Sequence, residues 1–240
     1  MSTTAYDFSE CSLCEAMMTV MAGVRTDFPT VEIRTRLAEM VAEAREHVSA
    51  DADQEQQLKQ LMDLFYREWG FTGASGIYRL SDALWLDNVL KTRQGTAVSL
   101  GALLLYIAGE LSLPLLPVIF PTQLIARADW IDGETWLINP FNGETLDEHT
   151  LDVWVKGTLG PTSGLYDEDL DEADNTTVVR KMLDTLKASL MAEQQLELAL
   201  QVSEVLLNMD PEDPYEIRDR GLIYAQLECE HIALNDLKYF

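Results

Sequence analysis

The chain has 240 residues, a mass of 27.0 kDa and a formal charge of −24, from 17 Lys and Arg against 41 Asp and Glu. This length allows one or two domains, and the 47% apolar content excludes a chain disordered throughout. The charge disfavours nucleic acid and anionic membranes as partners, so we expect protein or small-molecule partners. The apolar stretch 100–120 is interrupted by Glu110, Pro114 and Pro117, which argues against a membrane span.

The first helical segment carries two of the three cysteines. The first ten residues are polar and acidic and resemble no secretory leader. Cys11, Cys14 and Cys229 are too few for a disulfide framework. We therefore expect a cytoplasmic protein. Cys11 and Cys14 have metal or redox spacing, but a zinc site needs four ligands. We interpret both thiols as packing groups of one amphipathic helix over 8–24 and expect no metal or cofactor.

Periodicity divides residues 1–165 into a helical layer, 1–70, and a core, 71–165. The helical layer is predicted to continue with helices at 31–48 and 51–69, separated by a polar break at 49–53, and to end in a loop over 70–78. In the core, 96–109 is almost wholly apolar and predicts a helix buried on all sides. Strands are expected at 113–120, 124–131 and 134–138.

Turn residues complete the predicted core. Asp132-Gly133 indicates a two-residue hairpin, and Asn142-Gly143 a second turn. Thr145 and Glu148 have the spacing of a capping box for a helix that ends near Gly157. The predicted fold class is therefore α+β, with a buried helix packed on a small antiparallel sheet and helices on either side in the sequence.

An acidic segment follows the core. Between residues 166 and 175 the chain carries six carboxylates: Asp167, Glu168, Asp169, Asp171, Glu172 and Asp174. A calcium loop requires a Gly at its turn and a spaced terminal Glu, and neither is in register. We predict a solvated linker over 166–176.

Residues 177–240 show a repeat. Ala199 and Ala233 are 34 residues apart, the period of tetratricopeptide repeats. The pattern places Leu183, Leu186 and Leu190 on a buried face of the first unit, and Gly221, Tyr224 and Ala233 at the matching positions of the second. Lys187 and Arg220 depart from it, and a pair of antiparallel helical hairpins is the alternative. The second unit ends at Phe240 before its closing Asp-Pro, so we expect a truncated repeat. Two repeats cannot readily bury their own faces and should pack on the core.

Three motifs in the core carry a family resemblance. These are Gly95-Thr96-Ala97 at the start of the buried helix, Pro121-Thr122-Gln123-Leu124, and Asn139-Pro140-Phe141. In this order they resemble the transglutaminase-like core of the bacterial SirB family, which joins that core to C-terminal tetratricopeptide repeats. The resemblance covers nearly the whole chain.

The resemblance implies where a catalytic triad would stand. The nucleophilic cysteine of active transglutaminase-like enzymes falls on Ala97, the base histidine on Gln123 and the orienting aspartate on Asn139. Alanine has no nucleophile and glutamine cannot accept a proton near neutral pH. The resemblance thus implies a degenerate cleft formed by Thr96, Ala97, Ser99, Gln123 and Asn139, in which the two hydroxyl residues begin the helix.

The leading hypothesis is a non-catalytic interaction or regulatory protein that binds a protein or peptide through the groove of its repeats. The alternative is a hydrolase or acyltransferase that uses Ser99 with His149, a histidine between Asp147 and Asp152 that we otherwise interpret as solvated. A third possibility is an acidic decoy that mimics nucleic acid. Three tryptophans, Trp130, Trp136 and Trp154, either form an aromatic groove or pack on the outer face of the sheet.

Overall fold

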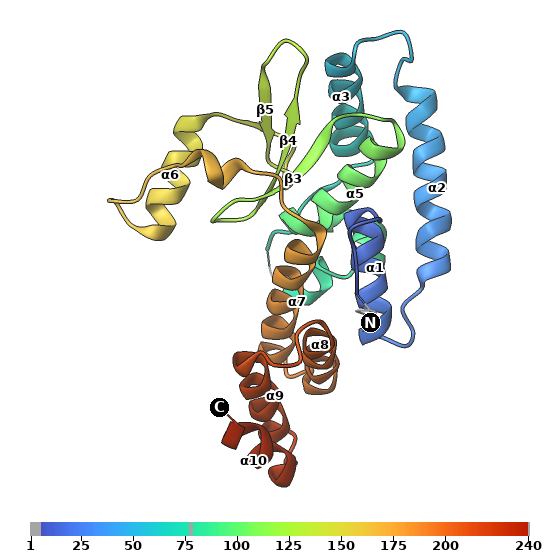
Figure 1. The fold of residues 1–240 in the computed structure, drawn as a ribbon. Coiled ribbons are helices and arrows are strands. Elements are labelled where there is room, and N and C mark those ends of the chain that lie inside the picture. The colour runs from blue at the N-terminus through green and yellow to red at the C-terminus, as the bar shows by residue number, and fades with distance from the viewer. Residues whose placement is uncertain (1–5, 77–78, 240) are drawn as a thin grey trace.

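The computed structural model describes residues 6–76 and 79–239. Its helices are α1 Leu13–Val24, α2 Thr30–His47, α3 Gln54–Asp63, α4 Leu86–Thr92, α5 Ala97–Glu110, α6 Glu148–Leu159, α7 Asn175–Ala192, α8 Leu196–Met209, α9 Pro214–Gln226 and α10 Glu230–Tyr239. Its strands are β1 Thr72–Gly73, β2 Gln94–Gly95, β3 Leu115–Ile119, β4 Leu124–Asp129, β5 Thr135–Ile138 and β6 Thr145–Leu146. Figure 1 shows the sheet between α6 and α5, with α7 to α10 below. The α+β class is confirmed.

The N-terminal layer packs around α5. α1 begins only at Leu13, because the Ser12 hydroxyl accepts the N–H of Glu15 and caps the helix there. The prediction of one helix over 8–24 was therefore wrong for its first turn: Cys11 precedes the helix, whereas Cys14 is fully buried in it. Asp53 caps α3 in the same way, which confirms the polar break before it.

After α3 the chain first continues as a helix and then forms a short strand within the predicted loop. The helix continues from Leu64 to Glu68 with π-helical geometry, and the N–H of Trp69 donates to the carbonyl of Leu64. β1 then pairs in parallel with β2, so the predicted loop over 70–78 contains a short strand, while its residues 77 and 78 lie outside the described part. Because β2 directly precedes α5 in the sequence, this pairing places β1 beside the start of α5.

α5 is the central helix, as predicted. Leu100, Leu103, Leu104 and Ile107 are fully buried in it. Gly101 permits the sheet to approach, because a Cβ atom at this position would lie 2.7 Å from Cδ2 of Leu124 in β4. Most of its residues are buried and Val98, Leu105 and Tyr106 are half-buried, which explains why this segment is apolar without the usual alternation.

The main sheet has the strand order β3-β4-β5-β6, with every neighbouring pair antiparallel. Alternate residues of its strands face opposite sides. Leu124, Ala126 and Ile138 join the large core around α5, whereas Ile125 and Leu137 join a smaller cluster that packs against Leu151 and Val155 of α6. The sheet therefore separates α5 from α6 (Figure 1).

Two local predictions in this region were wrong. The hairpin between β4 and β5 has a three-residue loop, because the N–H of Trp130 donates to Glu134 and the N–H of Gly133 to Trp130. Gly133 still adopts the left-handed region that the pattern requires, at φ 90°. α6 is capped by Asp147, whose carboxylate accepts the N–H of Thr150, because Thr145 belongs to β6. At its other end the helix runs past Gly157 to Leu159.

The acidic segment is solvated but is not a free linker. Five of the six carboxylates lie on exposed residues and Asp169 is half-buried, and Asp167–Leu170 form one turn of 3-10 helix. The backbone that follows pairs with the edge of β3: Glu172 bridges Val118, and the N–H of Ala173 donates to the Pro117 carbonyl. Arg127 also donates to the Leu170 carbonyl at 2.9 Å. The segment therefore covers a strand edge that would otherwise remain unpaired.

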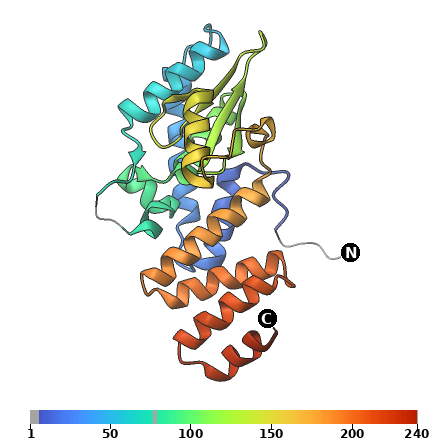
Figure 2. The ribbon, with the colours of Figure 1, turned by 90° about the vertical axis from the view of Figure 1, so that its left-hand side faces the viewer.

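The four C-terminal helices pack in sequence order, each against the next, and Figure 2 shows their zigzag. α7 and α8 also contact α1, so the repeats rest on the core. Gly221 explains the close approach of α9 and α10, because a Cβ atom there would lie 3.0 Å from both Asp236 Cβ and Leu237 Cγ. No helix within the described residues is both long and apolar enough to cross a membrane.

Two charged residues that depart from the repeat pattern are paired. The Lys187 ammonium is buried and lies 2.5 Å from Oε2 of Glu216 and 3.0 Å from Oδ2 of Asp219. Burial lowers the pKa of Lys187, but the hydrogen bonds and charges of its two partners outweigh this and leave that pKa raised. Arg220 makes two hydrogen bonds to the Asp236 carboxylate. α9 therefore meets α7 and α10 through charge pairs at positions where apolar or small residues were expected.

Candidate functional site

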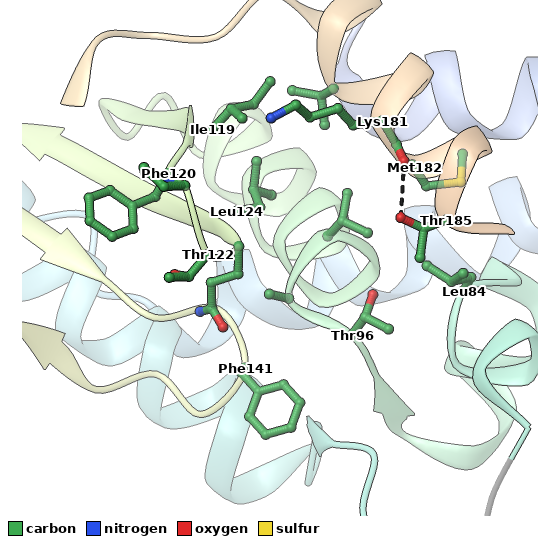
Figure 3. Close-up of a pocket in the computed structure, with 15 residues that line it drawn as sticks. Leu84, Thr96, Ile119, Phe120, Thr122, Leu124, Phe141, Lys181, Met182 and Thr185 are labelled. Carbon is green, nitrogen blue, oxygen red and sulfur yellow. Dashed lines mark hydrogen bonds between the residues drawn. The ribbon is translucent and has the colours of Figure 1, made fainter. Parts of the chain in front are cut away.

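A pocket of about 370 Å³ lies where the start of α5, the connection from β3 to β4, and α7 meet (Figure 3). Its walls are mainly apolar, and its polar side chains come from Thr96, Thr122, Gln123, Lys181 and Thr185. Three predicted site residues, Thr96, Ala97 and Gln123, line it. The motifs before α5 and after β3 are thus brought together by the fold.

Two hydroxyl residues fix the start of α5. Oγ1 of Thr96 accepts the N–H of Ser99, and Oγ of Ser99 accepts the N–H of Thr96 at 2.9 Å, which is a reciprocal capping box. Ser99 is fully buried and donates its hydroxyl to the carbonyl of Ala83 at 2.7 Å. The prediction that these hydroxyls begin the helix is confirmed, and Ser99 lies outside the pocket lining.

Gln123 and Asn139 form a pair of side-chain amides. Nε2 of Gln123 donates to Oδ1 of Asn139 at 2.7 Å, and the same oxygen accepts the backbone N–H of Phe141 at 3.0 Å. The backbone donor identifies this atom of Asn139 as the oxygen, so Gln123 must present its amino group to it. Among residues 6–76 and 79–239, the side-chain oxygen and the second N–H of Gln123 have no hydrogen-bond partner and are available to a ligand.

Asn139 is held in place from behind the pocket. It is 7% exposed, and the next residue, Pro140, accepts the hydroxyl of Tyr66 at 2.7 Å. Burial raises the pKa of Tyr66, so this hydroxyl stays protonated and remains a donor. The turn that follows closes on Gly143, whose N–H donates to the Asn139 carbonyl. The position of the amide pair is therefore set by the fold and does not depend on a ligand.

No cysteine lines this pocket. Cys14 is fully buried, and burial together with Glu15 raises the pKa of its thiol. Burial also raises the pKa of Cys11, with smaller contributions from Glu15 and Asp7. Cys229 is exposed in the turn between α9 and α10. A raised pKa lowers the thiolate fraction at neutral pH and so makes these two thiols poorer nucleophiles.

The alternative pair, Ser99 and His149, is not brought together. Ser99 is buried in α5 on one side of the sheet, and His149 is exposed on α6, which packs on the other side. The Ser99 hydroxyl is also occupied by the Ala83 carbonyl. A nucleophile and its base must come within hydrogen-bond reach, and this arrangement does not provide it.

The three tryptophans do not form one groove. Trp130 and Trp136 pack edge to face with ring centroids 4.9 Å apart on the side of the large core, and Lys59 lies 4.8 Å from the centroid of Trp136. Trp154 belongs to the small cluster on the other side, with its ring 6.4 Å from that of Phe120. They pack on the two faces of the sheet.

In the described residues no group of His, Cys, Asp and Glu could hold a metal ion.

The contribution of α7 was missed by sequence reasoning. Val178, Lys181, Met182 and Thr185 lie on one face of this helix and form one wall of the pocket. Their spacing of three and four residues is visible in the sequence and identifies a common face. It does not reveal that this face covers the start of α5, because that contact joins segments about 80 residues apart.

Comparisons with known proteins identify the family of the chain. Residues 31–184 match the transglutaminase-like superfamily and residues 186–240 the tetratricopeptide repeat. The chain is 62% identical over 239 residues to Protein SirB1 of Salmonella typhimurium, covering 100% of this chain and 89% of SirB1. It is 61% identical to UPF0162 protein YchA of Escherichia coli K12, with the same coverage. A UPF0162 protein of Vibrio cholerae is 37% identical over 234 residues, covering 98% of this chain and 87% of that protein.

Among solved structures, the chain is similar to menin, in a structure that reveals its binding site for the Mixed Lineage Leukemia protein, with a TM-score of 0.42 and 10% identity. The similarity covers 95% of this chain and 65% of the menin chain. It is too weak to support a conclusion about fold or function.

Proposed function

Because the chain belongs to the SirB1/UPF0162 family, which combines a transglutaminase-like core with a tetratricopeptide repeat region, we propose that it is a non-catalytic protein-binding protein. Its pocket between α5, the β3–β4 connection and α7 would hold a segment of a partner protein without cleaving or transferring it. The repeat region suggests protein binding, and a partner that enters the pocket would lie directly beside α7.

The amide pair is the observation that carries this proposal. The positions that the resemblance assigns to a base and its orienting group are joined by the hydrogen bond between Gln123 and Asn139 at 2.7 Å. An amide neither accepts a proton near neutral pH nor donates one as an acid. Ala97, at the position assigned to the nucleophile, supplies only a methyl group to the pocket. These three side chains support a pocket that binds a segment without reacting with it.

The same amides are suited to bind a peptide. The remaining carbonyl oxygen of Gln123 can accept a peptide N–H, and its remaining N–H can donate to a peptide carbonyl. The other walls of the pocket are mainly apolar and include Leu84, Leu124 and Phe141. A pocket with apolar walls and a few fixed polar groups is typical of a specific binding site.

The proposal is tested by peptide capture on the immobilised full chain. The probes are pools of random hexapeptides with acetylated and amidated ends, and bound peptides are quantified by mass spectrometry. We expect Gln123→Leu to lower capture about 5-fold, because a peptide group buried beside leucine loses its hydrogen-bond partner, at about 1 kcal/mol. Gln201→Leu, on the exposed face of α8, is the matched control and should leave capture unchanged.

Catalysis is tested separately with a panel of amide substrates and a thiol-directed covalent probe. We expect no turnover, and labelling only at the exposed Cys229. Turnover of any amide that is abolished by changing Ala97, Gln123 or Asn139 would refute the non-catalytic assignment. Capture that is insensitive to Gln123→Leu would refute the assignment of the pocket as the binding site.

A further inference from the structure

Lys181 is an unpaired cation at the edge of the pocket. About one residue in six of this chain is Asp or Glu, yet none of the 15 residues lining the pocket is acidic. Within 6–76 and 79–239, Lys181 forms no ion pair. The carboxylate three residues further on, Asp184, lies 3.9 Å from the ammonium of Lys187 instead. A positive charge in a pocket that has no acidic lining residue favours an anionic group there.

Two polar side chains, Lys181 and Thr96, mark opposite ends of the pocket. In Figure 3, Lys181 extends from α7 toward Ile119 at one end, and Thr96 and Phe141 lie at the other, with Leu124 between them. Thr185 does not compete for a ligand's carboxylate, because its hydroxyl donates to the carbonyl of Lys181 at 3.1 Å. A ligand that fills this space therefore needs an anionic end, an apolar middle and a further polar group.

We propose that the pocket takes the carboxyl-terminal residue of a partner protein, an apolar residue whose carboxylate binds Lys181. This inference rests on the proposed function and specifies which part of the partner enters. Only the last residue of a protein carries a carboxylate and an apolar side chain on the same Cα atom. An internal Asp or Glu would bring a carboxylate with one or two methylene groups and would leave most of the apolar wall uncovered.

The two ends of the pocket also define a direction. With the carboxylate at Lys181, the apolar side chain packs against Ile119, Leu124 and Met182. The chain upstream then runs toward Gln123, whose free oxygen accepts a backbone N–H.

The test compares matched peptide pools on the immobilised full chain. The first pool contains hexapeptides randomised at five positions that end in leucine with a free carboxylate, and the second is identical but ends in a carboxamide. A third pool ends in glutamate with a carboxamide, so that its only fixed carboxylate is on a side chain. We expect the first pool to be captured about 3-fold more than either of the others, the effect of one partly exposed ion pair.

Charge variants assign this difference to the lysine. Lys181→Gln keeps most of the side-chain length and should abolish the preference for the free carboxylate, so that the first two pools are captured equally. Lys91→Gln, an exposed lysine of α4 outside the pocket, is the matched control and should leave the preference intact. Competition by octanoate tests whether a free carboxylic acid is the better occupant.

The outcomes are distinct. Equal capture of the first two pools, with sensitivity to Gln123→Leu retained, overturns the carboxyl-terminal inference but leaves the proposed function standing. Equal capture of the first and third pools shows an internal acidic residue as the occupant and also overturns it, as does octanoate that displaces the first pool at concentrations below those of the peptides. Capture of no pool overturns both proposals.

Discussion

Restoring the lost groups would show whether the pocket keeps the geometry of a thiol site. The perturbation is the combined change Ala97→Cys, Gln123→His and Asn139→Asp. The hydrogen bond of 2.7 Å between residues 123 and 139 places an imidazole at position 123 where a carboxylate at position 139 can orient it. A neighbouring imidazolium lowers the pKa of a thiol, because it stabilises the thiolate.

The magnitude follows from the thiolate fraction. A thiol of pKa about 8.5 is about 0.1% thiolate at pH 5.5, and one lowered to about 6 is about one quarter thiolate. The lower pKa reduces the intrinsic nucleophilicity about 13-fold for a Brønsted coefficient of about 0.45. The net expectation is alkylation about 20-fold faster at pH 5.5 but only about 2-fold faster at pH 7.

The assay is alkylation by iodoacetamide followed by peptide mass spectrometry. The triple variant is compared with Ala97→Cys alone, and the exposed Cys229 of the same molecules is the internal reference. Equal rates at pH 5.5 in two variants that unfold at the same urea concentration would mean that positions 97 and 123 do not face each other. That result would refute the geometric argument for a degenerate cleft.

Three further predictions concern stability. Lys187→Met should lower the free energy of unfolding by about 3 to 5 kcal/mol in urea titrations, because it leaves Glu216 buried and uncompensated; if adding Glu216→Leu recovers none of this loss, the pairing argument is wrong. Gly221→Val should lower the free energy of unfolding by about 1 to 3 kcal/mol, because the new side chain would overpack against Asp236 and Leu237. Gly109→Ala has open space around it and should raise the free energy of unfolding by about 0.5 to 1 kcal/mol. Equal effects of the two variants in calorimetry would contradict the close contact at Gly221. Hydrogen bonds from the Thr177 side chain and backbone lower the pKa of Asp174 from 3.8, so its stabilisation is present above that pH and lost as pH falls below it. Asp174→Asn keeps the cap and should weaken the decline of the urea midpoint between about pH 5 and pH 2, and an unchanged decline would exclude this carboxylate as a cause.

Local chemistry made part of this fold predictable. The start of α5 follows from Thr96 and Ser99, which satisfy each other's backbone donors within four residues of sequence. The bend at Gly133 follows from a residue type that adopts positive φ. The cap of α6 was misplaced because Thr145 and Asp147 are both good capping residues, and only the pairing of β6 with β5 removes the first of them.

Contacts between distant segments were not predictable. The sequence predicts that the acidic segment is solvated, but its backbone pairing with β3 depends on which strand edge the fold leaves open. Lys187 stands out as a misfit in the repeat, yet its partner Glu216 comes from another helix. In the pocket, the resemblance identified Ala97 and Gln123, whereas Lys181 belongs to a wall that no motif marks.

α7 belongs to two parts of the structure at once. It is the first helix of the C-terminal stack and also one side of the pocket. Cutting the chain before Asn175 would remove Lys181 from the pocket and expose the core surface that Leu183 and Leu186 cover. The repeats are therefore not an interchangeable attachment. A protein that binds the repeats and shifts this helix would change the affinity of the pocket for its ligand. By thermodynamic reciprocity, the ligand in the pocket would change the affinity of the repeats for that protein by the same factor.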